Sequence, residues 1–222
     1  MAASTLGLDD TLQAYLLEHS LHEPEANRAL REHTLTLKDS VMISSPEQVQ
    51  FLLLLFRLQA ARRGLEIGTF TGYTALRLTL GIESLEMTCC DVSEAFTAIA
   101  REHWQAAGVD ARIDLRLGPA AETLQAMLAQ EAREGYYDFA YIDADKTGYR
   151  GYVEACFELV RPGGLIAIDN VLWSGAVAHP DDHDEDTVAL RDLNTWLHAT
   201  APDRFDLSLV PIGDGLTLLR LY

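Results

Sequence analysis

The sequence has few basic residues: 17 Lys and Arg stand against 34 Asp and Glu over 222 residues, which leaves a formal charge of −17. A phosphate backbone attracts clustered cations, so a surface this negative argues against nucleic-acid binding. The same charge disfavours adhesion to an anionic membrane surface. We therefore expect neither nucleic acid nor membrane among the partners.

Long apolar runs and cysteine pairs are also missing. The longest apolar run, residues 51–56, is far too short to span a bilayer, and residues 1–10 lack both parts of an export signal. The seven histidines contain no HExxH spacing and no cysteine belongs to a CxxC pair, so a zinc site has little support. The odd number of cysteines predicts reduced core thiols in a cytoplasmic protein, namely Cys89, Cys90 and Cys156.

Apolar material, by contrast, is sufficient for a full core. Hydrophobic residues make up 48% of the chain, which is too many for a disordered polymer. One α/β domain of this length can bury a core, and no repeat or Gly/Ser linker divides the chain. We therefore predict a single domain over residues 1–222, with a helical extension at 1–60 and an α/β core at 61–222.

Helical patterns fill the first part of the chain, and strands alternate with helices from residue 63 onward. Helices are predicted at 8–20 and 23–36, the second with Pro24 in its first turn, and a third starts with Ser45 as N-cap and Pro46 at its first position. Short apolar strands separated by helices indicate a parallel sheet with both faces covered. The predicted strands are 64–67, 86–90, 113–117, 139–142 and 165–168, and the helices between them are 71–80, 93–107, 120–134 and 148–159.

The end of the chain has a different pattern. Residues 186–200 are helical, and two β-rich segments, 205–210 and 215–221, are joined by a tight turn typical of an antiparallel hairpin. The predicted fold is a Rossmann-like αβα sandwich with a mostly parallel seven-stranded sheet, an antiparallel C-terminal hairpin and an N-terminal helical extension. In such sheets ligands bind at the carboxyl ends of the strands, near the point where the strand order reverses.

The first predicted strand ends in Glu66-Ile67-Gly68-Thr69-Phe70-Thr71-Gly72. Its glycines have GxxxG spacing, whereas dinucleotide-binding proteins have GxGxxG, in which the second glycine makes room for a pyrophosphate. An acidic side chain beside the turn is unfavourable for a pyrophosphate but suits a cation. The alternative is a simple strand-to-helix turn without a ligand.

The second and third strands end in weaker signals. Asp91 follows the second strand, where a carboxylate can accept hydrogen bonds from the ribose hydroxyls of an adenosine-containing ligand. Asp is also a common helix N-cap, and Ser93 could share that role. Gly118-Pro119-Ala120 follows the third strand and is either a loop with a helix start or a place where a backbone amide meets a ligand base.

The fourth and fifth strands end in acidic and amide side chains. Asp143, Asp145 and Lys146 follow the fourth strand, and Asp169 and Asn170 follow the fifth. If these strands are neighbours, they bring three oxygen donors together, those of Asp143, Asp169 and Asn170. Hard oxygen ligands of this kind favour Mg²⁺, Mn²⁺ or Ca²⁺ over zinc. The alternative is that these residues only cap the helices that follow.

Taken together, these segments resemble the cation-dependent class I O-methyltransferases that use S-adenosylmethionine. The resemblance is strongest to the caffeoyl-CoA O-methyltransferase-like group and weaker to the related catechol O-methyltransferases. The resemblance runs from about residue 35 to the end, and its most specific part is the order of DADK and DN. The matching segments are VMISSPEQVQFL at 41–52, LEIGTFTGYTAL at 65–76, CCDVSEAF at 89–96, GPAAETL at 118–124, YDFAYIDADKTGY at 137–149, RPGGLIAIDNVLWSG at 161–175 and PIGDGLTLLR at 211–220.

This resemblance implies roles for individual residues. Three positions match metal ligands, namely Asp143, Asp169 and Asn170. Lys146 matches a general base. The predicted catalytic residues are Lys146 and Asp143. Ser174 stands where plant members have Asn, so plant-type CoA-ester specificity does not transfer. The resemblance also implies a homodimer. Positions that match cofactor contacts are Ser44, Glu66, Gly68, Thr69, Thr74, Asp91, Ala120 and Asp145.

The implied reaction needs an oxygen nucleophile near neutral pH from a phenol whose pKa is about 10. A divalent ion lowers the pKa of a bound hydroxyl and fixes its position, and Lys146 would take the proton. We therefore predict a Mg²⁺-dependent O-methyltransferase that acts on a catechol-like phenolic or other vicinal-dihydroxy small molecule. The alternatives are a nicotinamide-dependent oxidoreductase and a cofactor-binding module without turnover. Trp173 would line the acceptor pocket or the core, and the acidic run 181–186 would form a lid or a solvated loop.

Overall fold

A seven-stranded sheet is the centre of the computed structural model, which describes residues 7–222. Its order is β3-β2-β1-β4-β5-β7-β6, and only β7 runs antiparallel to its neighbours β5 and β6. The predicted mostly parallel sheet with an antiparallel C-terminal hairpin is confirmed. The strands are β1 (Arg63–Ile67), β2 (Glu86–Asp91), β3 (Ile113–Leu117), β4 (Tyr137–Ile142), β5 (Val160–Ile168), β6 (Phe205–Val210) and β7 (Leu216–Leu221).

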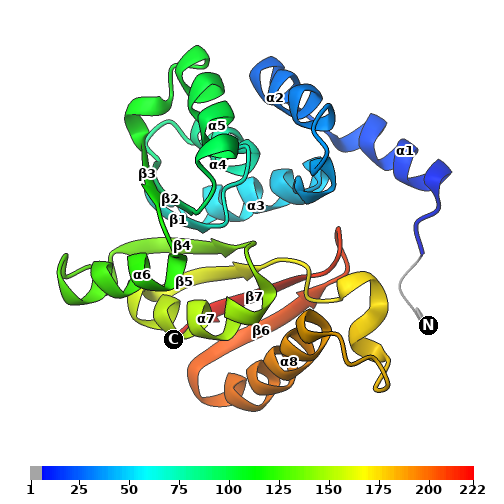
Figure 1. Cartoon of the computed structure of the whole chain (residues 1–222), viewed down its shortest axis with the longest axis vertical. Coiled ribbons are helices and arrows are strands. Elements are labelled where there is room, and N and C mark those ends of the chain that lie inside the picture. Colours follow the sequence, from blue (N-terminus) through cyan, green and yellow to red (C-terminus); the bar gives the residue numbers. More distant parts are fainter. Residues whose placement is uncertain (1–6) are drawn as a thin grey trace.

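Helices cover both faces of this sheet. Figure 1 shows α2 to α5 on one face and α6 to α8 on the other, while α1 extends away from the body. The α-helices are α1 (Asp10–Ser20), α2 (Glu25–Leu35), α3 (Pro46–Leu58), α4 (Tyr73–Gly81), α5 (Glu94–Ala106), α6 (Ala120–Ala129), α7 (Tyr149–Leu159) and α8 (Glu185–Arg204). Four short 3₁₀ helices join them, η1 (Ser40–Met42), η2 (Asp110–Arg112), η3 (Lys146–Gly148) and η4 (Trp173–Ala178).

The core lies in two layers, one on each side of the sheet. Successive strand residues point to opposite faces, so Cys89 packs with α3, α4 and α5, while Cys90 packs with α6, α7 and α8. Cys156 lies on the second side, and all three thiols are buried and free. The predicted core thiols are confirmed.

Some element boundaries differ from the prediction. Strand β5 begins at Val160, because the Pro162-Gly163-Gly164 segment is taken up by a register shift against β4 and does not end the strand. Helix α6 ends at Ala129, because Ala132 adopts a left-handed φ of 48° in the turn that follows. Helix α8 continues to Arg204 although Pro202 lies inside it.

The starts of two helices also need correction. Pro24 is the N-cap of α2 and lies before its first turn. Ser45 is the N-cap of α3 and Pro46 its first residue, as predicted, but the Ser45 hydroxyl makes no capping hydrogen bond. Among residues 7–222, no helix has both the length and the apolar character needed to cross a membrane.

The strand order reverses between β1 and β4, which are hydrogen-bonded neighbours. From β1 the chain moves outward to β2 and β3, and from β4 it moves outward in the other direction. The carboxyl ends of β1 and β4 are therefore the place where a parallel α/β sheet of this kind binds its ligand.

Candidate active site

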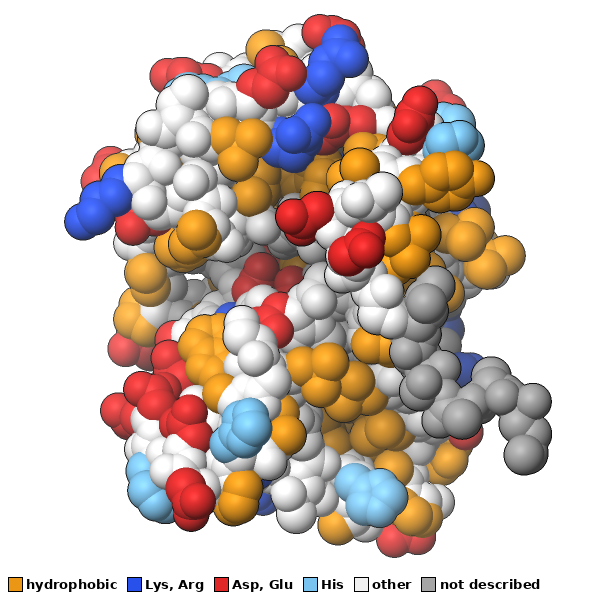
Figure 2. Space-filling view, turned by 90° about the vertical axis from the view of Figure 1, so that its right-hand side faces the viewer, with side chains coloured by type: hydrophobic (Ala, Val, Ile, Leu, Met, Phe, Trp, Pro, Cys, Tyr) orange, Lys and Arg blue, Asp and Glu red, His pale blue; other side chains and the backbone are white. Residues whose placement is uncertain are grey.

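A cavity of about 1200 Å³ opens at this end of the sheet. Figure 2 shows the molecule hollowed between its two halves, with acidic side chains inside the hollow. Every site residue predicted from the sequence lines the cavity, so the structure brings the whole set together. They are Ser44, Glu66, Gly68, Thr69, Thr74, Asp91, Ala120, Asp143, Asp145, Lys146, Asp169 and Asn170.

The glycine turn after β1 is required by close packing. Gly68 has φ +88°, and a Cβ there would overlap the carbonyl group of Asp143 in the neighbouring β4 loop. Gly72 has φ +80°, and its Cβ would overlap the Trp104 ring and the Ala100 side chain. Both positions therefore need glycine for its left-handed backbone and for the absent side chain.

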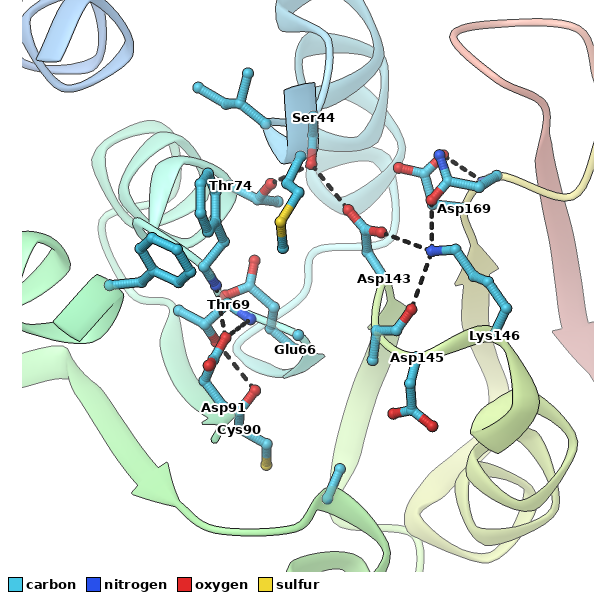
Figure 3. Close-up of a pocket in the computed structure, with 18 of the residues that line it drawn as sticks. Ser44, Glu66, Thr69, Thr74, Cys90, Asp91, Asp143, Asp145, Lys146 and Asp169 are labelled. Carbon is cyan, nitrogen blue, oxygen red and sulfur yellow. Dashed lines mark hydrogen bonds and ion pairs between the residues drawn. The ribbon is translucent and has the colours of Figure 1, made fainter. Parts of the chain in front are cut away.

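Glu66 is a buried carboxylate with unused hydrogen-bonding capacity. The residue is 1% exposed, and within residues 7–222 its Oε2 atom has no hydrogen-bond partner. Burial raises the pKa of Glu66 to about 8, and the negative charges of Asp143 and Asp91 act in the same direction. Figure 3 shows the carboxylate pointing into the space between Thr69 and Thr74. A buried, unpartnered acid in this place suits a cationic ligand.

Asp91 organises the glycine turn. Its Oδ2 accepts hydrogen bonds from the backbone N–H groups of Thr69 at 2.9 Å and Phe70 at 2.7 Å, and its Oδ1 accepts one from Ser93 at 2.7 Å. The N-cap of α5 is Ser93, whose hydroxyl accepts from the Phe96 amide. Because a carboxylate offers about four lone pairs and three are used, Asp91 can accept one further hydrogen bond.

Lys146 lies where the predicted oxygen donors meet. Its Nζ donates to Asn170 Oδ1 at 2.7 Å and lies 3.3 Å from Asp143 Oδ1. It also donates to Tyr149 Oη at 2.7 Å and to the Ala144 carbonyl at 3.0 Å. In Figure 3 Asp143 lies beside the lysine head group and Asp169 lies above it in the view. Oxygens that converge on one cation form a donor set that fits a divalent metal ion.

The candidate metal set is two carboxylates and one amide. Within residues 7–222, no group of three or more His, Cys, Asp or Glu side chains is placed to hold a metal, so the amide of Asn170 is needed to complete the set. Burial raises the pKa of Asp143, and burial together with the charge of Asp143 raises the pKa of Asp169 to about 7. Bringing a cation between these two acids would relieve that electrostatic cost.

Two residues beside Asp169 have no part in the prediction. Its Oδ2 accepts hydrogen bonds from Tyr141 Oη at 2.6 Å and from Gln48 Nε2 at 2.7 Å. Ser44 Oγ lies 3.1 Å from Tyr141 Oη and 3.4 Å from Asp143 Oδ2. Tyr141 stands two residues before Asp143 in β4, so strand alternation was the available sequence signal for it.

The remaining predicted residues lie at the edges of the cavity. Ala120 begins α6 and is buried. The Asp145 carboxylate points away from Asp143 in Figure 3 and accepts a hydrogen bond from Tyr152 Oη at 2.6 Å. Trp173 is half-buried and lines the cavity, with the Lys146 Nζ 5.6 Å from its ring centroid. Trp173 also packs against the core layer that contains α7 and α8, so both predicted positions describe it.

The acidic segment 181–186 corresponds to the predicted solvated loop before a helix. Asp181 is exposed, and Asp184 caps α8 by accepting from the amides of Asp186 and Thr187. Asp186 itself lines the cavity. The segment is therefore a solvated helix start whose last residue borders the cavity.

Comparison with known proteins gives a match to one family over most of the chain. The family model described as O-methyltransferase matches residues 17–222. Catechol O-methyltransferase domain-containing protein 1 of Mus musculus is 40% identical, over 95% of this chain and 79% of its own length. Probable caffeoyl-CoA O-methyltransferase 2 of Dictyostelium discoideum is 39% identical, over 95% of this chain and 91% of its own.

Solved structures share the same architecture. A methyltransferase of Podospora anserina in its SAH-bound (S-adenosylhomocysteine) form has a TM-score of 0.87 at 30% identity, with 99% of both chains covered. An O-methyltransferase of Bacillus cereus in complex with SAH has a TM-score of 0.86 at 26% identity, with 96% of this chain and 97% of the other covered.

Proposed function

This chain belongs to the O-methyltransferase family and is an S-adenosylmethionine-dependent O-methyltransferase. We propose that it methylates one hydroxyl of a catechol-like phenol or another vicinal-dihydroxy small molecule. We propose further that a divalent ion assists this reaction. The observation that carries this proposal is the convergence of Asp143 and Asn170 oxygens on the Lys146 ammonium, with Asp169 beside them. Such a set of hard oxygens fits Mg²⁺, with Mn²⁺ or Ca²⁺ as substitutes.

In this proposal Asp143, Asp169 and Asn170 hold the metal. When bound, the ion lowers the pKa of an acceptor hydroxyl and fixes its position. A vicinal diol suits the arrangement, because one hydroxyl can be held while its neighbour reacts. Carboxylate charge on two of the three ligands balances the charge of a divalent cation.

Lys146 moves the proton in this proposal. The acceptor oxygen would attack the methyl carbon, and the carbon–sulfur bond would break with its electron pair going to sulfur. The hydroxyl proton would go to the lone pair of Lys146 Nζ, which must enter this step as a neutral amine. Tyr149 Oη and the Ala144 carbonyl, at 2.7 and 3.0 Å, keep Nζ in place. General-base catalysis from a positioned group contributes about 10² to 10⁴ in rate.

The other half of the cavity would hold the cofactor. Glu66 fits the cationic part of S-adenosylmethionine because its buried Oε2 has no other partner. Phe70 and Phe96, with ring centroids 4.6 Å apart, and Ala120 provide apolar walls for an aromatic base. Ser44, Gly68, Thr69, Thr74, Asp91 and Asp145 complete the proposed cofactor contacts.

We also propose that the enzyme is a cytoplasmic homodimer of one-domain subunits, with 1–60 as the extension and 61–222 as the core. Helix α1 contains no buried residue, and Leu8 and Tyr15 are more than half exposed. An eleven-residue helix is marginal by itself in water, so a second copy is expected to cover it. Light scattering of the purified protein should give twice the 24.6 kDa chain mass, and a monomer mass would contradict the dimer.

The function is tested with purified protein, S-adenosylmethionine and a panel of catechols, flavonoids and hydroxycinnamoyl esters, with and without Mg²⁺. Asp143→Ala and EDTA should each abolish catechol turnover, while calorimetry still detects binding of S-adenosylhomocysteine. Lys146→Met should lower kcat by about 10² or more. Lys38→Met is the matched control, because Lys38 is the only other lysine and is exposed. Undiminished activity in EDTA would contradict the metal requirement.

A further inference from the structure

The Asp169 carboxylate is held by donors on both of its oxygens. Tyr141 Oη and Gln48 Nε2 donate to Oδ2 at 2.6 and 2.7 Å, and the Asn170 backbone N–H donates to Oδ1 at 2.7 Å. Asp169 is 3% exposed, and the Tyr141 and Gln48 residues are each 1% exposed. Water cannot easily replace these donors, so the orientation of the carboxylate is set by the protein.

These bonds leave few lone pairs on Asp169 for a ligand. A carboxylate has about four lone-pair positions, two on each oxygen. On Oδ2 both are taken by Tyr141 and Gln48, whereas on Oδ1 one is taken by Asn170. Only one position, on Oδ1, remains available. Asp169 can therefore offer a cation one oxygen and cannot offer both.

The two donors are themselves fixed by separate parts of the fold. Tyr141 lies in β4, in register with Ala167 of the adjacent strand β5. Gln48 comes from α3. Its amide oxygen packs closely against Gly213 in the β6–β7 turn, where a Cβ would overlap it, and this contact holds the Gln48 side chain in place. The Gln48 amide also lies 3.3 Å from the Tyr141 hydroxyl, which links the two donors.

We propose that Tyr141 and Gln48 are positioning residues that restrict Asp169 to single-oxygen ligation and thereby favour Mg²⁺ over Ca²⁺. The inference rests on the proposed metal-dependent function. Mg²⁺ takes six ligands in a near-ideal octahedron, whereas Ca²⁺ takes six to eight oxygens and often both oxygens of one carboxylate. A carboxylate with only one available oxygen satisfies Mg²⁺, whereas Ca²⁺ loses one of the oxygen ligands that it would otherwise take.

The test uses the variant Tyr141→Phe/Gln48→Met, which removes both donors and keeps much of the side-chain volume. Mn²⁺ binding with S-adenosylhomocysteine present is followed by electron paramagnetic resonance, and Mg²⁺ and Ca²⁺ are titrated as competitors. Loss of outer donors typically weakens metal binding about 10- to 100-fold. We expect Mg²⁺ affinity to fall by about tenfold and Ca²⁺ affinity to fall less, so that the Mg²⁺/Ca²⁺ affinity ratio decreases. A Mg²⁺/Ca²⁺ affinity ratio that stays the same or increases would overturn the inference.

Tyr137→Phe is the matched control for this experiment. Tyr137 is also a buried β4 tyrosine, but its hydroxyl bonds with Thr88 and Arg133 and it packs in the other core layer. It should leave the ion ratio unchanged. If the double variant does not fold, Tyr141→Phe alone should still lower the ratio. A wild-type protein that binds no Mn²⁺ would instead refute the metal dependence itself, so the two failures are distinguishable.

Discussion

Glu66 is the residue whose protonation state depends most visibly on the cavity around it. Its carboxylate is buried beside two other acids, and burial first, then their charges, raises its pKa from 4.5 to about 8. The folded protein therefore keeps a proton on Glu66 at neutral pH, whereas the unfolded chain has lost it. Binding of a cationic cofactor would reverse this preference and release the proton.

This difference predicts how stability depends on pH without ligands. Between the unfolded pKa of 4.5 and the folded pKa of about 8, the native state binds more protons than the unfolded state, so the free energy of unfolding falls as pH rises. One group contributes at most about 1.4 kcal/mol per pH unit. Asp169, with its pKa raised to about 7, acts with the same sign, so Glu66→Gln should make the slope shallower without removing it.

Urea unfolding of the ligand-free protein from about pH 5 to pH 8 measures this slope, because the window lies between the two pKa values of Glu66. Glu83→Gln is the matched control, since Glu83 is exposed and lies outside the cavity. An identical slope in Glu66→Gln and the wild type would show that Glu66 is already ionised in the native state.

At the scale of elements, the β1–α4 turn and the β4 loop hold each other in place through Gly68. A Cβ at Gly68 would overlap the Asp143 carbonyl group, which belongs to backbone and cannot move aside. Gly175 has the same φ of +88°, but a Cβ there would meet no heavy atom of residues 7–222 within 4 Å apart from its chain neighbours. The two glycines therefore separate the cost of a left-handed backbone from the cost of the contact.

Gly68→Ala should destabilise the protein more than Gly175→Ala. We expect about 1–2 kcal/mol for the left-handed conformation in Gly175→Ala, and about 3 kcal/mol or more in Gly68→Ala because a steric overlap is added. Urea unfolding of both variants gives the comparison. Equal losses would mean that the β4 loop moves freely and that the turn does not fix the position of Asp143.

The elements that sequence patterns predict well are those whose signal is local. Short apolar runs separated by helical segments predicted the parallel strands, and the pairing of β4 with β5 brings Asp143 and Asp169 to the same cavity. Strand β5 was predicted too short because its Pro-Gly-Gly segment has the composition of a turn, while pairing with β4 keeps it in the sheet. Local composition cannot show that pairing with a neighbouring strand will keep such a segment in the sheet.

Tyr141 and Gln48 escaped the sequence analysis for a related reason. One lies within a buried apolar strand and the other in an amphipathic helix far away in the chain, and only the register of β4 with β5 and the packing of α3 bring them to Asp169. The residues that bear charge at strand ends were predictable, whereas the neutral donors that orient them depend on tertiary contacts.

At the scale of the whole molecule, the negative charge extends into the active site. Among the residues that the structure describes, Lys146 is the only Lys or Arg that lines the cavity. Seven carboxylates line it, namely Glu66, Asp91, Asp143, Asp145, Asp169, Asp186 and Asp214. A cationic cofactor and a divalent metal would offset part of this charge at their own ends. Asp186 and Asp214, the latter accepting from the Ser174 amide, add negative charge to the cavity beyond the residues assigned to the cofactor and the metal, within a chain of formal charge −17.

This charge predicts which acceptors the enzyme uses best. A neutral catechol enters without electrostatic cost, whereas a hydroxycinnamoyl-CoA ester carries several negative charges and is repelled by the acidic surface. Raising the ionic strength from 0.01 to about 0.15 M shortens the Debye length from about 30 Å to about 8 Å and screens that repulsion. With Mg²⁺ held constant, kcat/KM for the CoA ester should therefore rise several-fold with salt, while kcat/KM for the catechol changes little. A CoA-ester kcat/KM that falls with salt would instead reveal a cationic docking surface and contradict the preference for uncharged acceptors.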